Sequence, residues 1–328
     1  MQLNDCMEST DDFATDINED MLKSLDVVCF GILFPLLVAT VDEYPKADSG
    51  ADILSLNEFI GADAPITSFI LDGLGCRVGL ISNDLGNDPG GHELLDRLKR
   101  TDIVTAVSAR GDVSTPFCLT VVDRDSNRTW FTLQSDAIES LLTADLSLVH
   151  QTDFLYVDAY PQMWQASLRA IDCALELGVP IFVNMDQVVP NEELGRRLQR
   201  GPSIIQIGAV GQSIEKAEKM AQTFFDSYSP SLCVITMAQD GVIYTNHSGT
   251  YHLPAHDIEV ANTAGAGATF SAGLIFGRVR SWPDDETVAF ANALAGLYCS
   301  VPSGFSCFSV ADVMEFAASR GIQLTKLY

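Results

Sequence analysis

Basic residues are scarce in this chain of 328 residues. It contains 19 Lys and Arg against 44 Asp and Glu, which gives a formal net charge of −25. Nucleic-acid binding relies on clustered Lys and Arg that contact phosphates, and anionic membranes attract the same side chains. The composition therefore argues against both classes of binding protein, and we expect neither nucleic acid nor membrane as a partner.

Long apolar runs and the features of a signal peptide are also lacking. The sequence has no stretch of about 18 or more uncharged apolar residues, the length that marks a transmembrane candidate. Its N-terminus has neither a basic start nor an apolar segment. We therefore expect no transmembrane span and a cytoplasmic location.

Disulfide and metal-binding patterns are missing too. The eight cysteines form no C-x-x-C pair, and the five histidines form no H-E-x-x-H motif. Most cysteines lie in apolar runs, where a free thiol behaves as a small hydrophobic side chain. This pattern indicates reduced thiols in a reducing compartment. We expect no metal cluster built from protein ligands.

The chain divides at about residue 25. Residues 1–24 carry seven acidic residues and one Lys, which predicts a solvated, disordered tail. From there to residue 328, short apolar strands alternate with amphipathic helices. Repeated strand–helix units imply a mainly parallel sheet covered by helices on both faces. We therefore predict an α/β domain over residues 25–328.

Two segments do not follow this alternation. Residues 32–60 contain several short β-rich stretches, and residues 112–134 include the runs FCLTVV and TWFTL around a polar turn, which predicts a hairpin. We expect these strands to form a small β lid attached to one edge of the sheet.

The segment Val260–Arg278 carries the strongest functional signal. Gly265, Ala266 and Gly267 precede a run that reads as a helix. Such a turn exposes backbone N–H groups and the positive end of the helix dipole, and both favour an anion such as phosphate. The alternative is a tight turn that only packs the helix against the sheet.

This segment resembles the D-T-x-G-A-G-D signature of the pfkB (ribokinase-like) carbohydrate and nucleoside kinases, with matches at Thr263, Gly265, Ala266 and Gly267. Residues 74–99, 114–133, 234–244 and 289–295 are similar to further family segments in the same order. The resemblance implies a ribokinase-like three-layer α/β/α core with a β lid. It also implies ATP or ADP with Mg²⁺, a small-molecule acceptor alcohol, and a homodimer formed through lid strands.

The resemblance also assigns sites. The implied phosphate-binding residues are Asn262, Ala264, Gly265, Ala266 and Gly267. The implied nucleotide pocket contains Thr236, Gly241 and Asn292. The implied substrate pocket contains Leu36, Gly61, Asp63 and Ile66.

Several positions depart from the family pattern. The last Asp of the signature, which is the family's general base, is Ala268 here, and a methyl group cannot accept a proton. Asn262 stands for the first Asp. Leu36 and Ile66 occupy positions where the family has sugar-binding Asp and Asn. Residues 208–213 lack the N-x-x-E element linked to Mg²⁺ and phosphate.

These departures suggest a degenerate member and leave three hypotheses. The first is a pseudokinase that binds a nucleotide or phosphate without the usual base. The second is an active ATP-dependent phosphotransferase on a sugar- or nucleoside-like alcohol, with a substitute base such as Asp63 or Asp257. The third is a repurposed scaffold with a different reaction on an apolar phosphorylated ligand.

Overall fold

The computed structural model describes residues 25–125, 127–185, 189–301 and 308–321. The predicted acidic tail, residues 1–24, lies outside the described residues.

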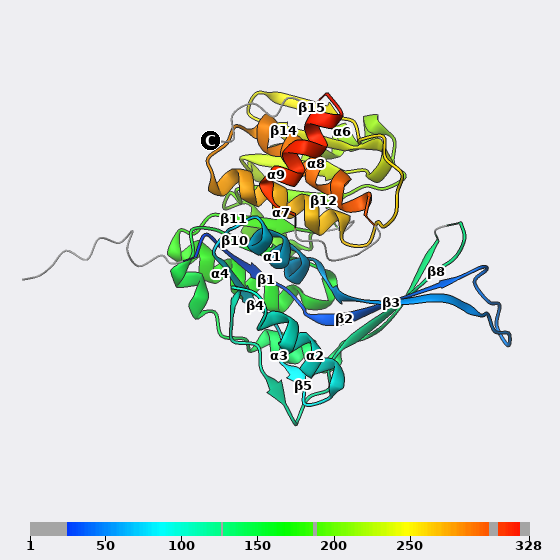
Figure 1. The fold of residues 1–328 in the computed structure, drawn as a ribbon. Coiled ribbons are helices and arrows are strands. Elements are labelled where there is room, and N and C mark those ends of the chain that lie inside the picture. Colours follow the sequence, from blue (N-terminus) through cyan, green and yellow to red (C-terminus); the bar gives the residue numbers. More distant parts are fainter. Residues whose placement is uncertain (1–24, 126, 186–188, 302–307, 322–328) are drawn as a thin grey trace, which may run out of the picture.

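A nine-stranded sheet forms the centre of the domain (Figure 1). Its order is β15-β14-β13-β12-β11-β10-β1-β4-β6. The strands from β6 to β13 run parallel, and β14 and β15 are antiparallel additions at one edge. Their bounds are Val27–Phe30 (β1), Val78–Ile81 (β4), Val104–Thr105 (β6), Leu155–Asp158 (β10), Ile181–Asn184 (β11), Ile204–Gly208 (β12), Leu232–Thr236 (β13), Val242–Asn246 (β14) and Gly249–Leu253 (β15).

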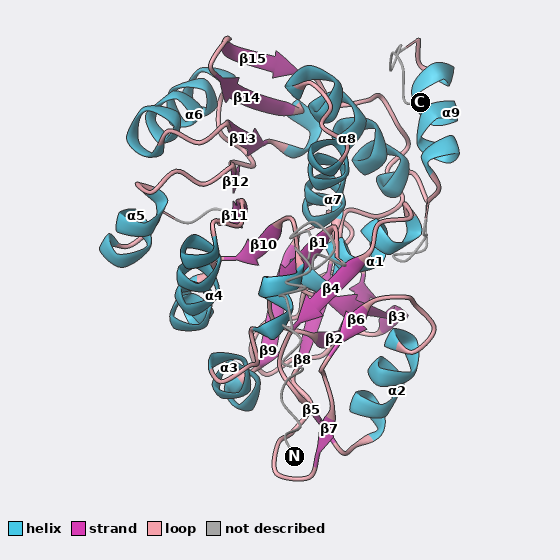
Figure 2. Ribbon diagram, turned by 90° about the vertical axis from the view of Figure 1, so that its left-hand side faces the viewer, coloured by secondary structure: helices cyan, strands magenta, loops and turns pink. Residues whose placement is uncertain are grey.

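Helices cover both faces of this sheet (Figure 2). One face packs against α1 (Asp63–Gly73), α2 (Pro89–Leu98), α7 (Ala266–Val279), α8 (Asp284–Cys299) and α9 (Val310–Ser319). The other packs against α3 (Ser135–Leu142), α4 (Trp164–Leu177), α5 (Glu192–Leu198) and α6 (Ile214–Tyr228). The central strands are buried on both sides, which explains their continuous apolar sequences. The predicted three-layer α/β/α core is confirmed.

A second sheet projects from the core, to the right in Figure 1. It contains β2 (Phe34–Val41), β3 (Ile53–Gly61), β8 (Phe117–Val122) and β9 (Arg128–Leu133), in the order β3-β2-β8-β9. We call these four strands the lid. A separate two-stranded pair, β5 (Leu85–Gly86) and β7 (Ala109–Arg110), lies near α2.

The sequence patterns described above do not indicate α3. This helix follows the hairpin directly, and its eight residues are too few for a clear helical period. Helix α9 begins with a capping box at Ser309.

Gly61 allows β3 to approach β2 closely. A methyl group on Gly61 would lie 2.1 Å from the Phe34 ring, its cross-strand partner. We expect Gly61→Ala to lower the free energy of unfolding by about 1–3 kcal/mol, as overpacking does. Gly50→Ala is the control, because a methyl group there meets nothing within 4 Å. Urea denaturation measures the free energy of unfolding of both variants. Equal values for Gly61→Ala and Gly50→Ala would contradict this packing.

Candidate functional site at the carboxyl edge of the sheet

Asp158, the last residue of β10, is fully buried. Its Oδ2 accepts a hydrogen bond from the Ala64 amide at 2.8 Å, and its Oδ1 accepts from the Tyr156 hydroxyl at 2.9 Å. A methyl group on Gly31 would lie 2.5 Å from Asp158 Oδ2, so Gly31 leaves the space that this carboxyl group occupies. Burial raises the pKa of Asp158 well above its ordinary value, and the charge of Asp63 adds to the effect.

Asp63 is the first residue of α1 and is half-buried. Its Oδ2 accepts hydrogen bonds from the Tyr160 hydroxyl and, at 2.9 Å, from Asn184 Nδ2. Burial raises the pKa of Asp63, while these two donors oppose the shift. Its Oδ1 forms no hydrogen bond with the described part of the chain. Asp63 Oδ1 is therefore held in a fixed orientation, in which it is able to accept a proton or a hydrogen bond from a ligand hydroxyl.

A row of polar residues continues from this point along the sheet. Asp158, Asn184 and Gln206 stand in register on β10, β11 and β12. Parallel strands end at the same edge, where ligands of open α/β sheets bind. Gln206 Nε2 donates to Gly267 O at 3.3 Å, and Gln206 Oε1 accepts from Ser271 Oγ at 3.0 Å. The row therefore connects Asp63 and Asp158, which we call the acidic pair, with the start of α7.

The predicted anion turn precedes α7. Gly265 has φ 88°, and a methyl group there would meet Tyr298 Oη at 2.8 Å and Ile66 Cδ1 at 3.2 Å, so only glycine fits. Tyr298 Oη donates to Ala264 O at 2.7 Å. These contacts fix the turn against α8 and against the first turn of α1.

Some backbone amides of the turn donate hydrogen bonds within the chain, and others do not. The Ala264 amide donates to Asn262 Oδ1 at 3.0 Å, and the Ala266 amide donates to Thr263 O at 3.3 Å. Among the described residues, the amides of Gly265 and Gly267 have no acceptor. Gly267 is exposed, with open space where its side chain would be. The turn therefore offers two amides to an anion, and Asn262 shapes it.

Most residues predicted to line the substrate pocket pack against other side chains instead. Ile66 is 5% exposed and belongs to the apolar core, Gly61 lies against the Phe34 ring, and Leu36 packs partly buried in the lid. Only Asp63 of this group joins the polar row. Ala268 is fully buried in the same core as Ile66, and its carbonyl oxygen accepts from Thr67 Oγ1 at 3.1 Å.

The three nucleotide-pocket positions belong to other elements than the acidic pair: Thr236 ends β13, Gly241 precedes β14 and Asn292 lies on α8. Asn292 Nδ2 donates to Pro254 O at 3.0 Å. Gly241 has φ 88° and lies against the end of β15. A methyl group on Gly241 would be 2.2 Å from the carbonyl oxygen of Leu253. Thr236 ends β13, directly opposite Val242. Gly241 and Asn292 therefore meet at one loop, residues 253–256.

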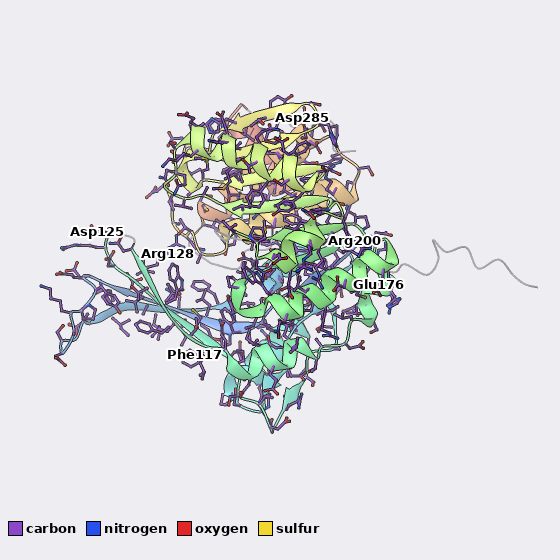
Figure 3. The ribbon with its side chains drawn as sticks, turned by 180° about the vertical axis from the view of Figure 1, so that it is seen from behind. Phe117, Asp125, Arg128, Glu176, Arg200 and Asp285 are labelled. Atoms are coloured by element: carbon purple, nitrogen blue, oxygen red, sulfur yellow. The ribbon has the colours of Figure 1, made fainter. Side chains whose placement is uncertain are left out.

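An arginine of the lid, Arg128, contacts the predicted anion turn. Arg128, at the start of β9, donates from Nη2 to Thr263 Oγ1 at 2.5 Å. Figure 3 shows Arg128 where the lid comes back toward the core. A positive side chain of the lid thus reaches the turn that the sequence marks as an anion site.

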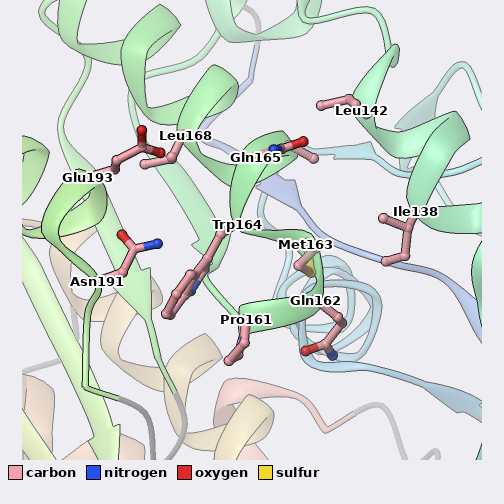
Figure 4. Close-up of a pocket in the computed structure, with 11 residues that line it drawn as sticks. Ile138, Leu142, Pro161, Gln162, Met163, Trp164, Gln165, Leu168, Asn191 and Glu193 are labelled. Atoms are coloured by element: carbon pink, nitrogen blue, oxygen red, sulfur yellow. The ribbon is translucent and has the colours of Figure 1, made fainter.

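In the described parts of the chain, no group of three or more His, Cys, Asp or Glu side chains is placed to hold a metal ion. Residues 208–213 have no carboxylate, so this segment does not fit the Mg²⁺ that the family resemblance implies. None of the described helices has the length and apolarity to cross a membrane. A pocket of about 300 Å³ beside Trp164, between α3, α4 and α5, contains none of the predicted site residues (Figure 4).

The mainly parallel sheet, its lid and the Gly-rich turn at a helix N-terminus define a ribokinase-like α/β protein. The chain belongs to the pfkB family: the model of the pfkB family carbohydrate kinases matches residues 25–310. The fold is shared with the ribokinase of Thermotoga maritima (TM-score 0.72, 17% identity, 90% of this chain and 99% of that one). It is also shared with the nucleoside kinase of Burkholderia thailandensis, solved with inosine (TM-score 0.69, 15% identity, 91% and 98%).

Curated relatives are kinases. The mouse ketohexokinase is 20% identical over 85% of this chain and 98% of its own length. The ATP-dependent ribose-1-phosphate kinase of Halopiger xanaduensis is 22% identical over 85% and 94%. The 5-dehydro-2-deoxygluconokinase of Geobacillus thermodenitrificans is 31% identical over 99 residues, which span 30% of this chain and 29% of that protein.

Sequence reasoning missed five residues of the site: Arg128, Asp158, Tyr160, Asn184 and Gln206. Asp158 and Asn184 each end an apolar strand (LYVD, IFVN), and Gln206 interrupts another (IIQIG). One polar residue in each of three buried strands was a usable signal. Arg128 gave no such signal, because its role depends on how the hairpin folds over the core.

The acidic pair makes stability depend on pH. Because the folded chain raises the pKa of Asp158 above 3.8, it holds a proton that the unfolded chain releases. This stabilisation is complete below about pH 4 and is lost as the pH rises through the raised pKa. Asp158→Asn, which retains the shape without the proton, should flatten the fall in melting temperature as the pH rises above about 4. Asp125→Asn, in the exposed hairpin, is the control. An unchanged slope in Asp158→Asn would contradict the assignment.

Proposed function

We propose that this chain is a pfkB-family protein that binds the phosphate groups of a nucleotide or of another phosphorylated small molecule and transfers phosphoryl groups poorly. One observation carries the proposal: at the N-terminus of α7 the amides of Gly265 and Gly267 have no acceptor among the described residues, while the next residue, Ala268, has no proton-accepting side chain. Phosphoryl transfer depends mostly on positioning and charge stabilisation. A site can therefore hold phosphate and still lack the group that activates the acceptor hydroxyl.

A second candidate is an active ATP-dependent phosphotransferase on a sugar- or nucleoside-like alcohol. Asp63 supports this candidate, because its Oδ1 accepts no hydrogen bond from the described residues and its pKa is raised, as a general base needs. In this candidate Asp63 takes the proton from the acceptor hydroxyl, and Tyr160 and Asn184 hold the carboxylate in place. ATP or ADP is the expected nucleotide in both candidates.

Two further properties belong to the proposal. The lid exposes Leu54, Leu56, Trp130 and Phe131, which supports a homodimer formed through lid strands. The cysteines of the described residues are free thiols, mostly buried, which supports a reducing, cytoplasmic location.

Nucleotide-dependent stability tests the binding function. ATP and ADP, with and without Mg²⁺, should raise the melting temperature of the unaltered protein; a ligand at 100 times its Kd stabilises a fold by about 2.7 kcal/mol. Gly267→Asp should remove the rise, because it places a negative charge at the turn in open space. Gly267→Ala, which adds only a methyl group there, is the control. No rise with any nucleotide would contradict nucleotide binding and favour a repurposed scaffold.

ATP consumption separates the two candidates. With a panel of sugars and nucleosides as acceptors, the binding function predicts turnover near background in the unaltered protein and in Asp63→Asn. The kinase candidate predicts turnover that Asp63→Asn lowers by about 10²–10⁴-fold, the usual contribution of a general base. Ala268→Asp, which returns a carboxylate to the family position, should increase turnover if the remaining geometry supports transfer.

A further inference from the structure

The cavity between α3, α4 and α5 has the size of a small-molecule site (Figure 4). Its volume is about 300 Å³, at the lower end of the range of ligand pockets in proteins. The helices that line it cover one face of the sheet, whereas the predicted anion turn precedes α7 on the other face. A ligand in this cavity would therefore be distinct from one held at the turn.

Hydrogen bonds within the chain hold the wall of the cavity in place. Trp164 Nε1 donates to Ala159 O at 2.9 Å. The Met163 amide donates to Tyr160 O at 3.0 Å. Because these bonds fix the chain where it enters α4, the cavity is formed before a ligand arrives, which lowers the entropic cost of binding.

Trp164 offers a ligand the face of its ring. The indole has one polar group, Nε1–H, and this donor already bonds Ala159 O. The half-buried ring lines the cavity. The face of a Trp ring is rich in electrons and attracts cations more strongly than the face of Tyr or Phe. The aromatic wall therefore favours a positively charged ligand.

Glu193 supplies a negative charge at the same cavity. It alone is charged among the described residues that line the cavity. Both arginines of α5 pair with other carboxylates: Arg197 with Asp172 at 2.8 Å, and Arg196 with Glu192 at 3.2 Å. The Glu193 carboxylate therefore remains able to pair with a cationic ligand.

Apolar side chains complete the lining. Met163 and Leu168 are buried, and Ile138 and Leu142 are half-buried. These side chains suit a short carbon body. The net charge of −25 also raises the concentration of cations near the surface of the protein. The lining and the charge together match a small molecule with one positive group and an apolar part.

We propose that this cavity is a second binding site, which takes a small organic cation such as a quaternary ammonium or a primary amine with a short apolar body. The ammonium group lies over the Trp164 ring and pairs with the Glu193 carboxylate, and the carbon body contacts Met163 and Leu168. This site does not depend on the proposed phosphate binding, because it shares no residue with the anion turn.

Choline is the probe for this site, and its uncharged carbon analogue, neohexyl alcohol, is the matched control ligand. Nuclear magnetic resonance of protein labelled with ¹⁵N-tryptophan follows the indole signals of Trp130, Trp164 and Trp282. Choline should shift the Trp164 signal saturably with a Kd of about 1 mM and leave the other two in place. Neohexyl alcohol should bind about tenfold more weakly, because it lacks the charge.

Glu193→Gln and Glu192→Gln separate the cavity from the general charge of α5. Both residues are in the first turn of that helix, but Glu192 does not line the cavity. Glu193→Gln should raise the Kd for choline about threefold to fivefold, the effect of one exposed charge pair. Glu192→Gln should leave it unchanged.

Three results would overturn the cation site. The first is a Trp164 signal that choline does not shift. The second is an equal Kd for choline and neohexyl alcohol, which would mean that the cavity binds apolar groups without recognising charge. The third is an equal loss of affinity in Glu193→Gln and Glu192→Gln, which would assign the effect to the overall charge of α5.

Discussion

Burial of Asp158 is the constraint on which the rest of the site depends. A carboxyl group removed from water is costly unless hydrogen bonds replace its hydration. Here those bonds come from Ala64 on α1, Tyr156 on β10 and Asn184 on β11. Three elements are therefore fixed at one edge of the sheet. The same arrangement places Asp63 beside Tyr160 and Asn184. Because Asn184 donates to both carboxyl groups, the buried Asp158 helps to position the partly exposed Asp63.

The position of α1 also determines the anion turn. Ile66, in the first turn of α1, lies against Gly265, and Tyr298 holds Ala264 from the other side. Gln206 joins the polar row to the Gly267 carbonyl group. The two buried or half-buried carboxyl groups and the glycine-rich turn thus share one connected framework. The family resemblance assigns the base position to Ala268, which is why we propose ligand binding separately from phosphoryl transfer in this chain.

The sequence allowed the fold and the turn to be predicted because both depend on local patterns. Apolar strands alternating with helices defined the core, and small residues before an apolar helix marked residues 265–267. The acidic network could not be assembled in the same way. Asp63 and Asp158 are 95 residues apart, and only the strand order brings them together. The contact between Arg128 and Thr263 depends on the angle of the lid, which no local pattern determines.

The central proposal is that the Gly265–Gly267 turn binds phosphate in a chain whose family base position is Ala268. Nuclear magnetic resonance of protein labelled with ¹⁵N-glycine tests it directly, because the amides of Gly265 and Gly267 report on an anion that they bind. We predict that ADP or pyrophosphate shifts both signals, while the signal of Gly50, in the loop between β2 and β3, stays in place. Unchanged signals from Gly265 and Gly267 at saturating nucleotide would contradict the account.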